Sequence, residues 1–293
     1  WLPNTYYLKV EGWNLTLRLM RGMYALVQFA YFHNWLLFLL PLSIVLFRRD
    51  WKMALMMLLL AGQIAYSVYV GGDAWENHGG ANRYIILAMP LYFIGFSWAA
   101  VEWLKRAANS LNLKQKNFAG FGWRFVFVVL FAFSLITFNA LLGDWKSIER
   151  WNLARRPDYV AGNDRNLQIA IALEQVTKPG ASVAVIGAGT IPYLLPDRYA
   201  IDILGKADPY IAHQSVRTPM GIPDIPNMRP GHMKWDYAYT IGELQPDVIV
   251  SLWENTSEEA APYMTNYDFV TIAPKIKVYL RRDSTNINWE LLK

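Results

Sequence analysis

The stretch that decides the fold is residues 53–104, which read MALMMLLLAGQIAYSVYV (53–70), GGDAWENHGGANR (71–83) and YIILAMPLYFIGFSWAAVEWL (84–104). Each apolar run is close to the length of a helix that crosses a bilayer, which needs about 20 apolar residues. The loop between them holds two carboxylates, one histidine, one arginine and four glycines. Ionisable groups next to membrane spans are costly and indicate function. The loop 71–83 is therefore the first place to look for a site.

Two further apolar runs lie at 24–47 and 125–142. We therefore predict an α-helical membrane region over residues 23–143, with about four transmembrane helices. The alternative is a set of buried helices in a large soluble domain. Four such runs leave no polar face for water, which favours the membrane interpretation.

Charge divides the chain into two halves. Residues 1–143 carry twelve Lys or Arg and five acidic residues, a net charge of +7, whereas residues 144–293 carry −2. The basic excess lies beside the apolar runs, where it indicates topology rather than nucleic-acid binding, and we expect no nucleic-acid partner. The absence of cysteine excludes disulfides and thiolate metal sites. Because the chain starts at Trp1 without a signal peptide, we expect it to be part of a longer protein.

Lys and Arg counts predict the orientation. The connections 48–52 and 105–124 carry +2 and +5, whereas the loop 71–83 carries −1. The positive-inside rule puts the two basic connections in the cytoplasm and the loop outside, in a multi-pass protein of a bacterial inner membrane. Residues 1–22 then form an outer interfacial segment, with a helix over 13–23. Its Arg18 and Arg21 share one face and meet either lipid headgroups or an anionic lipid-linked substrate.

The C-terminal part, residues 144–293, is predicted to be an extracytoplasmic α/β domain. Helical spacing marks residues 166–177, and short apolar runs bounded by turn residues mark strands. The expected strands are at 182–190, 198–205, 247–253, 269–274 and 276–282, the last two forming an antiparallel pair.

The turn Gly187-Ala188-Gly189 raises the alternative of a dinucleotide site. Pro192 stands where that motif needs Gly or Ala, and Asp202 is nearer than the usual acidic residue about 20 positions on. We therefore interpret the turn as a tight exit from a strand.

Three motifs together resemble the C-terminal half of a GT-C membrane glycosyltransferase. They are Pro3-Asn4-Thr5-Tyr6-Tyr7-Leu8-Lys9, Gly71-Gly72-Asp73 followed by Asn82-Arg83-Tyr84, and Asp202-Ile203-Leu204-Gly205-Lys206-Ala207-Asp208. The set is similar to the branch that contains the terminal arabinofuranosyltransferases of actinobacterial cell walls.

This resemblance implies an enzyme that transfers a sugar from a polyprenyl-phosphate donor to a cell-envelope glycan or lipid acceptor at the outer membrane face. Some members of the superfamily use a divalent cation such as Mg or Mn. The resemblance also implies that the principal catalytic acid lies in the first outer loop, upstream of Trp1.

The candidate residues for chemistry lie in the 71–83 loop. Asp73 could orient a sugar hydroxyl or act as a base, or it could simply cap a helix end. Glu76 could share a divalent cation with Asp73 through oxygen ligands. His78 could be a ligand or a proton carrier, although a lone histidine in a loop is more often neither.

The candidate residues for the donor are basic and aromatic. Cations that could hold the lipid phosphate are Lys9, Arg18, Arg21 and Arg83, for which the alternative is anchoring at the membrane interface. The aromatic residues expected to contact the sugar or the acceptor are Tyr6, Tyr7 and Trp75. The alternative function is a non-catalytic membrane-anchored subunit that binds a glycan or a partner protein.

Overall fold

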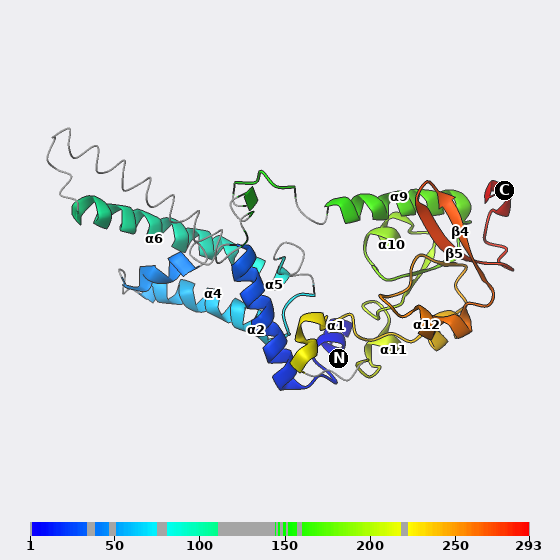
Figure 1. Ribbon diagram of the computed structural model, residues 1–293, viewed down its shortest axis with the longest axis horizontal. Coiled ribbons are helices and arrows are strands. Elements are labelled where there is room, and N and C mark those ends of the chain that lie inside the picture. Colours follow the sequence, from blue (N-terminus) through cyan, green and yellow to red (C-terminus); the bar gives the residue numbers. More distant parts are fainter. Residues whose placement is uncertain are drawn as a thin grey trace. The chain divides into compact units, whose positions relative to one another are not determined.

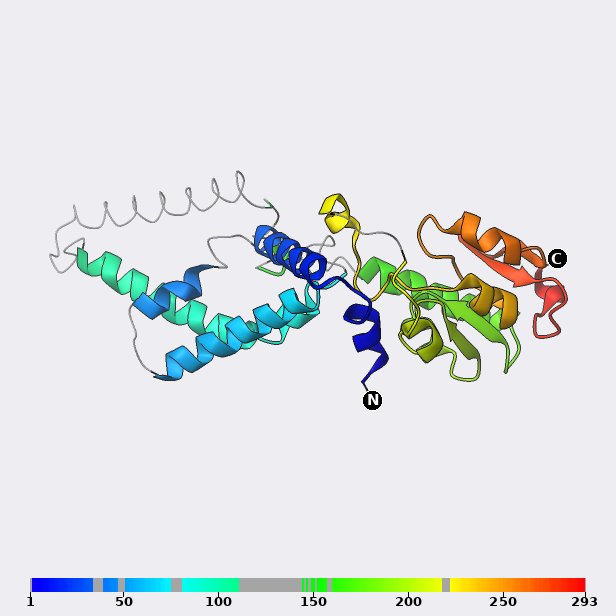
Figure 2. The same ribbon diagram turned by 90° about the horizontal axis from the view of Figure 1, so that it is seen from below.

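The computed structural model forms two compact units (Figures 1 and 2). Unit 1 comprises Trp1–Asn14, Pro157–Met220 and Met228–Lys293, and unit 2 comprises Leu15–Arg156 and Gly221–Asn227. The structure describes residues 2–33, 39–46, 51–74, 81–110, 144, 146, 149–150, 152–156, 160–217 and 222–292.

Unit 2 is helical, as the sequence predicts (Figure 1). Its main elements are α2 (Leu15–Phe32), a 3-10 segment (Leu40–Leu46), α4 (Trp51–Tyr69), α5 (Arg83–Ile86) and α6 (Met89–Ser110). In the described part of the chain, α4 alone is both long enough and apolar enough to cross a bilayer. The run 125–142 lies outside the described residues, so four transmembrane helices remain a prediction.

Two helix boundaries differ from the expected ones. The helix expected to end at residue 23 continues to Phe32, so the interfacial segment and the start of the first apolar run form one helix. The run 84–104 contains two helices, α5 and α6, separated by a turn at Leu87 and Ala88. Pro90 explains this break because it cannot donate to the carbonyl of Ile86 and is tolerated only in the first turn of a helix.

Helix α2 packs closely on α4 at Gly22. A Cβ atom at this position would lie 2.1 Å from the carbonyl oxygen of Val68. A side chain of any size would therefore force the two backbones apart. The buried residues of α2 repeat with the spacing of one helix face, Arg18, Arg21, Gly22, Ala25 and Phe29.

Unit 1 contains a mixed α/β sheet of five strands, which confirms the predicted C-terminal α/β domain. Its strands are β1 (Ser182–Val185), β2 (Tyr199–Asp202), β3 (Val248–Ile249), β4 (Tyr267–Ala273) and β5 (Ile276–Arg281). Its helical elements are α1 (Asn4–Lys9), α9 (Val160–Val176), α10 (Thr190–Leu194), α11 (Pro209–Ala212), a π-helical turn (Ala238–Glu243), α12 (Ser257–Ala260) and 3-10 turns at Ala261–Tyr263 and Trp289–Leu292.

The strand order is β2-β1-β3-β5-β4. Strand β1 is parallel to β2 and β3, whereas β5 is antiparallel to β3 and β4. The predicted closing hairpin is therefore confirmed. Its turn contains Lys275 at φ 64°, a left-handed conformation that is uncommon for a residue other than glycine.

Side chains alternate between two apolar layers on the faces of this sheet. Val183, Val185 and Val248 pack with α9 and α10 on one face, whereas Ala184 and Ile249 pack with the segment around Trp235–Ile241 on the other. This alternation is the period of two expected of a strand. Because both faces are covered, β1 is buried at three of its four positions.

The Gly22 contact gives a test of the α2–α4 packing. We expect Gly22→Ala to destabilise the protein by about 1–3 kcal/mol, the usual cost of overpacking, and to lower the thermal midpoint in detergent. Gly62→Ala on α4 is the matched control, since a Cβ there meets nothing within 4 Å. Alanine favours the helix, so the control is expected to be neutral or stabilising. Equal midpoints for the two variants would contradict the close packing.

Candidate functional site

The loop that follows α4 begins with a helix cap made by Gly71 and Gly72. Both have left-handed φ values, 85° and 78°. The amide of Gly72 donates to Ser67 O at 2.7 Å, and the amide of Gly71 donates to Val68 O at 3.1 Å. This is the Schellman pattern, in which glycine ends a helix and satisfies its last carbonyl groups. The glycine pair therefore ends α4 and turns the chain toward Asp73.

Asp73 is buried and ion-paired with Arg83, on the other side of the loop. Its side chain is 1% exposed, whereas that of Arg83 is 66% exposed. Arg83 donates from Nε to Oδ2 at 2.7 Å and from Nη2 to Oδ1 at 2.8 Å. The amides of Arg83 and Ala74 add bonds of 3.1 and 2.9 Å to the same carboxylate. This bidentate pair fixes the guanidinium while leaving Arg83 accessible.

Asn82 completes the closure of the loop. Its Oδ1 accepts from the amides of Tyr84 and Ile85, each at 3.1 Å, and thereby caps α5. Its Nδ2 donates to Ser67 Oγ on α4 at 3.0 Å. Asparagine is a favoured helix N-cap because its side chain satisfies the first amides. The motif Asn82-Arg83 thus joins the two helix ends through one cap and one ion pair.

Arg18 and Arg21 of α2 lie at the same end of α4. They are 4% and 3% exposed. Arg21 Nη2 donates to the backbone oxygen of Asp73 at 3.4 Å, and the Arg18 guanidinium lies 4.7 Å from the centre of the Tyr69 ring. The structure thus brings together four of the residues that the sequence singled out. We call Arg18, Arg21, Asp73 and Arg83 the arginine cluster.

This geometry bears on the roles predicted for Asp73. Both carboxylate oxygens accept from N–H groups, so a base role would compete with the ion pair. A divalent cation would have to displace Arg83, and the described residues contain no group of three or more side chains suited to a metal. The metal site predicted for Asp73 and Glu76 remains a prediction, because the structure describes only one of the two carboxylates. Glu76, His78 and Trp75 lie outside the described residues.

Unit 1 contains Lys9, which was predicted to bind the donor phosphate, and Tyr6 and Tyr7, which were predicted to contact the sugar or the acceptor. The Tyr7 ring packs on His213 at a centroid distance of 4.0 Å. Tyr6 is 38% exposed, and the aliphatic chain of Lys9 lies against Gly231, where a Cβ would come within 3.0 Å of it. The structure therefore places Tyr7 and Lys9 against the Pro- and Gly-rich region that precedes β3.

Lys234, which sequence analysis missed, anchors α1 within unit 1. It is 1% exposed, and its Nζ donates to Tyr7 O and Ala212 O, each at 3.0 Å. Burial lowers the pKa of Lys234, and the Glu11 carboxylate partly offsets this. The ammonium thus ties the ends of α1 and α11 together. Because its partners are backbone carbonyls far away in the sequence, no local pattern reveals it.

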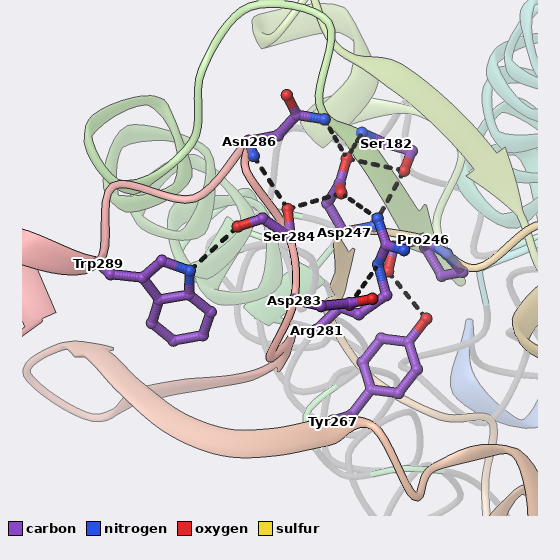
Figure 3. Close-up of polar contacts among 9 residues, drawn as sticks. All are labelled: Ser182, Pro246, Asp247, Tyr267, Arg281, Asp283, Ser284, Asn286 and Trp289. Carbon is purple, nitrogen blue, oxygen red and sulfur yellow. Dashed lines mark hydrogen bonds and ion pairs between the residues drawn. The ribbon is translucent and has the colours of Figure 1, made fainter.

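A second polar cluster surrounds Asp247 at the start of β3 (Figure 3). Its carboxylate accepts from Ser182 N at 2.8 Å and from Arg281 Nη2 at 2.8 Å. Ser284 Oγ and Asn286 Nδ2 add bonds of 2.7 and 3.0 Å. Burial opposes ionisation, but these donors outweigh it and hold the pKa of Asp247 well below its usual range. The cluster links β1, β3 and β5, which indicates a structural role.

The structure gives no support to a nucleotide at Gly187-Ala188-Gly189. Helix α10 has five residues and contains Pro192, and a Cβ at Gly187 or Gly189 would meet nothing within 4 Å. The Asp202 carboxylate accepts from the amides of Leu204 and Ala207 at 3.0 and 2.7 Å. Both of its oxygens therefore already bind the backbone, whereas a nucleotide site would need them to accept from a ribose. The turn is a strand exit.

The comparisons with known proteins concern unit 1 for the most part. Residues 143–289, just over half of the chain, match the family described as "Domain of unknown function (DUF8728)". The chain belongs to this family. No curated protein and no solved structure matches the chain.

Replacement of Asp247 tests whether its cluster is structural. We expect Asp247→Asn to destabilise unit 1 by about 3 kcal/mol, because it removes the closer of the two charge partners of the half-buried Arg281 and leaves only the exposed Asp283 at 3.7 Å. An aspartate whose pKa is lowered on folding stabilises the protein above its unfolded pKa of about 3.9. This contribution is lost as pH falls through the lower pKa of the folded state. The difference in unfolding free energy between the original protein and Asp247→Asn should therefore be largest at pH 7 and should shrink below about pH 4.

The matched control for this variant is Asp268→Asn. Asp268 is paired with Arg282 at the surface, and exposed ion pairs contribute little. Chemical unfolding followed by fluorescence at pH 7 and at pH 3 measures both variants. The role assigned to Asp247 would be contradicted if the loss of unfolding free energy in Asp247→Asn did not depend on pH. It would also be contradicted if both variants lost the same unfolding free energy.

Proposed function

We propose that this protein is the C-terminal portion of an integral-membrane glycosyltransferase. It transfers a sugar from a polyprenyl-phosphate donor to a glycan or lipid acceptor of a bacterial cell envelope. The arginine cluster holds the donor phosphate at the outer face of the membrane. The resemblance of the three motifs to GT-C enzymes supports the class, and the geometry of unit 2 supports the location of the donor.

The arginine cluster is the observation that carries this proposal. Three guanidinium groups from α2 and α5 gather at the end of α4 with the one carboxylate of Asp73. Arg18 and Arg21 are buried, which preorganises their positive charge. Arg83 is held by two bonds to Asp73, and its side chain is 66% exposed. A planar guanidinium in this position suits the oxygens of a phosphate.

The chemistry assigned to the cluster is stabilisation of the leaving group. In the transfer, the bond between the anomeric carbon and the phosphate oxygen breaks, and the phosphate leaves with the electron pair as polyprenyl phosphate. A bond forms between the same carbon and the acceptor oxygen, whose proton passes to a carboxylate base. Fixed cations beside the leaving phosphate lower the barrier because they need no reorganisation. Asp73 acts here as the residue that positions Arg83, and the base is a different carboxylate.

The transmembrane helices are part of the same proposal. The apolar helix α4 and the charges of the connections support a multi-pass protein with the 71–83 loop outside. A reporter fused after residue 114 should then be cytoplasmic, and a reporter fused after residue 160 should be extracytoplasmic. Alkaline phosphatase and green fluorescent protein fusions measure this. The opposite pattern would put the arginine cluster on the wrong face for the proposed donor.

Replacement of Arg83 tests the donor site in the full-length protein. We expect Arg83→Ala to lower kcat by about 100-fold, the loss typical of one removed transition-state donor. Because this change leaves the Asp73 carboxylate buried without Arg83, the double variant Asp73→Asn/Arg83→Ala removes the buried charge as well. The double variant should regain thermal stability but not activity. Transfer from a radiolabelled polyprenyl-phosphate sugar is the assay.

Arg106→Ala is the matched control for these variants. Arg106 is an exposed arginine on α6, paired with Glu102, and it lies at the end of α6 that is expected to be cytoplasmic. The control should keep full activity. Full activity of both Arg83 variants would refute the donor site, and so would a similar loss in the control.

A further inference from the structure

Unit 1 contains an open pocket of about 390 Å³ beside the edge strand β2. This volume falls within the range of small-molecule sites, about 300–1,000 Å³. The pocket is lined by three tyrosines, two aspartates and a few apolar residues. The lining residues that matter for its chemistry are Tyr199, Asp202, Asp208, Tyr210, Tyr239 and Leu244.

Two of the tyrosines form a continuous aromatic wall. The ring centroids of Tyr210 and Tyr239 are 4.3 Å apart with an interplanar angle of 40°. Tyr210 is 50% exposed and Tyr199, on β2, is 67% exposed. Large aromatic side chains that stay exposed beside a pocket offer apolar faces and hydroxyl groups to a ligand at a low cost in conformational entropy.

The loop from Asp202 to Asp208 holds the pocket in shape. The buried Asp202 carboxylate binds two amides of this loop. Gly205 has φ 74°, and a Cβ there would lie 2.7 Å from Ile211 Cγ2, so the turn requires glycine. This loop is the third motif of the sequence. Its internal bonds indicate a preformed wall, which limits the ordering cost on binding.

Asp208 supplies the polar contact of the pocket. Its Oδ1 caps α11 by accepting from Ile211 N at 3.1 Å. Its Oδ2 accepts from the Tyr239 hydroxyl at 3.4 Å, a long bond that leaves acceptor capacity on a carboxylate with about four lone-pair sites. Burial and the Asp208 carboxylate raise the pKa of Tyr239, so its hydroxyl stays protonated and can donate.

The backbone that carries Tyr239 is also unusual. Ala238–Glu243 is a π-helical turn, a rare conformation that is found frequently at functional sites. Leu244, which follows the turn directly, closes the same pocket. The wall is therefore built from two specialised segments, the motif loop and the π-helical turn.

We propose that this pocket binds a neutral saccharide, with a sugar ring against Tyr210 and Tyr239 and its hydroxyl groups donating to Asp208. No cationic side chain is found among its described lining residues, and two are carboxylates, so an anionic ligand is disfavoured. A quaternary ammonium needs rings arranged around it. Here two of the three rings pack on each other at an angle of 40° instead of surrounding a common centre, and this arrangement suits a sugar ring lying against them better.

This site is distinct from the arginine cluster, since all its residues lie in unit 1. The inference does not rest on transferase activity, and saccharide binding can be measured without a lipid donor. A saccharide site in this unit fits either an acceptor subsite or a glycan-binding module.

Saturation-transfer NMR on the full chain in detergent tests the proposal. The probes are mannobiose, galactobiose and arabinobiose, with glucuronic acid and choline as charged competitors of other classes. We expect at least one neutral disaccharide to bind and Tyr210→Ala to weaken it about tenfold, as loss of an aromatic partner does. Asp208→Asn keeps the helix cap and should weaken a saccharide by about tenfold through the loss of a charged hydrogen-bond acceptor.

The matched control is Tyr193→Ala. Tyr193 is 83% exposed in the same unit and is not part of the pocket lining, so this variant should bind like the original protein. The proposal is overturned if no disaccharide binds at 10 mM, if choline or glucuronic acid binds in preference, or if Tyr193→Ala weakens binding as much as Tyr210→Ala. If the Arg83 variants lose transfer activity but bind the disaccharide as before, the pocket and the arginine cluster are independent sites.

Discussion

The ion pair between Asp73 and Arg83 is the interaction on which the helical unit depends. A carboxylate that is almost fully buried needs a charge partner and hydrogen bonds, and Arg83 supplies both. The pair closes the loop between α4 and α5 and holds the Arg83 guanidinium at the end of α4, where α2 contributes Arg18 and Arg21. Arg83 therefore closes the loop while its side chain stays 66% exposed, which makes it available for the proposed contact with a phosphate.

Much of the helical unit could be predicted from the sequence, but its contacts could not. Apolar runs and charge counts identified the helices and singled out Arg18, Arg21, Asp73 and Arg83. They assigned each residue a separate role, and the structure shows that Asp73 and Arg83 work as a pair. Opposite charges at the two ends of one loop would have allowed this inference. The helix break before Pro90 could also have been predicted from the sequence, because proline is tolerated only in the first turn of a helix.

In the sheet unit, local patterns located the strands but not their order. The hairpin of β4 and β5 is a local contact and was predicted correctly, whereas the position of β3 between β1 and β5 depends on long-range packing. Asp247 gathers donors that lie between 34 and 65 residues away, so no spacing rule could reveal it. The pocket tyrosines were missed for the same reason, although the sequence had already marked the loop from Asp202 to Asp208.

Binding of a lipid-linked phosphate by the arginine cluster can be tested in native membranes. The most direct measurement is photo-crosslinking in native membranes with a polyprenyl phosphate that carries a diazirine next to the phosphate, followed by peptide mapping. If the arginine cluster holds the phosphate, we expect labelling within residues 15–24 and 69–84, competition by unlabelled polyprenyl phosphate, and no competition by the uncharged polyprenol. Labelling confined to other segments, or equal competition by the polyprenol, would contradict it.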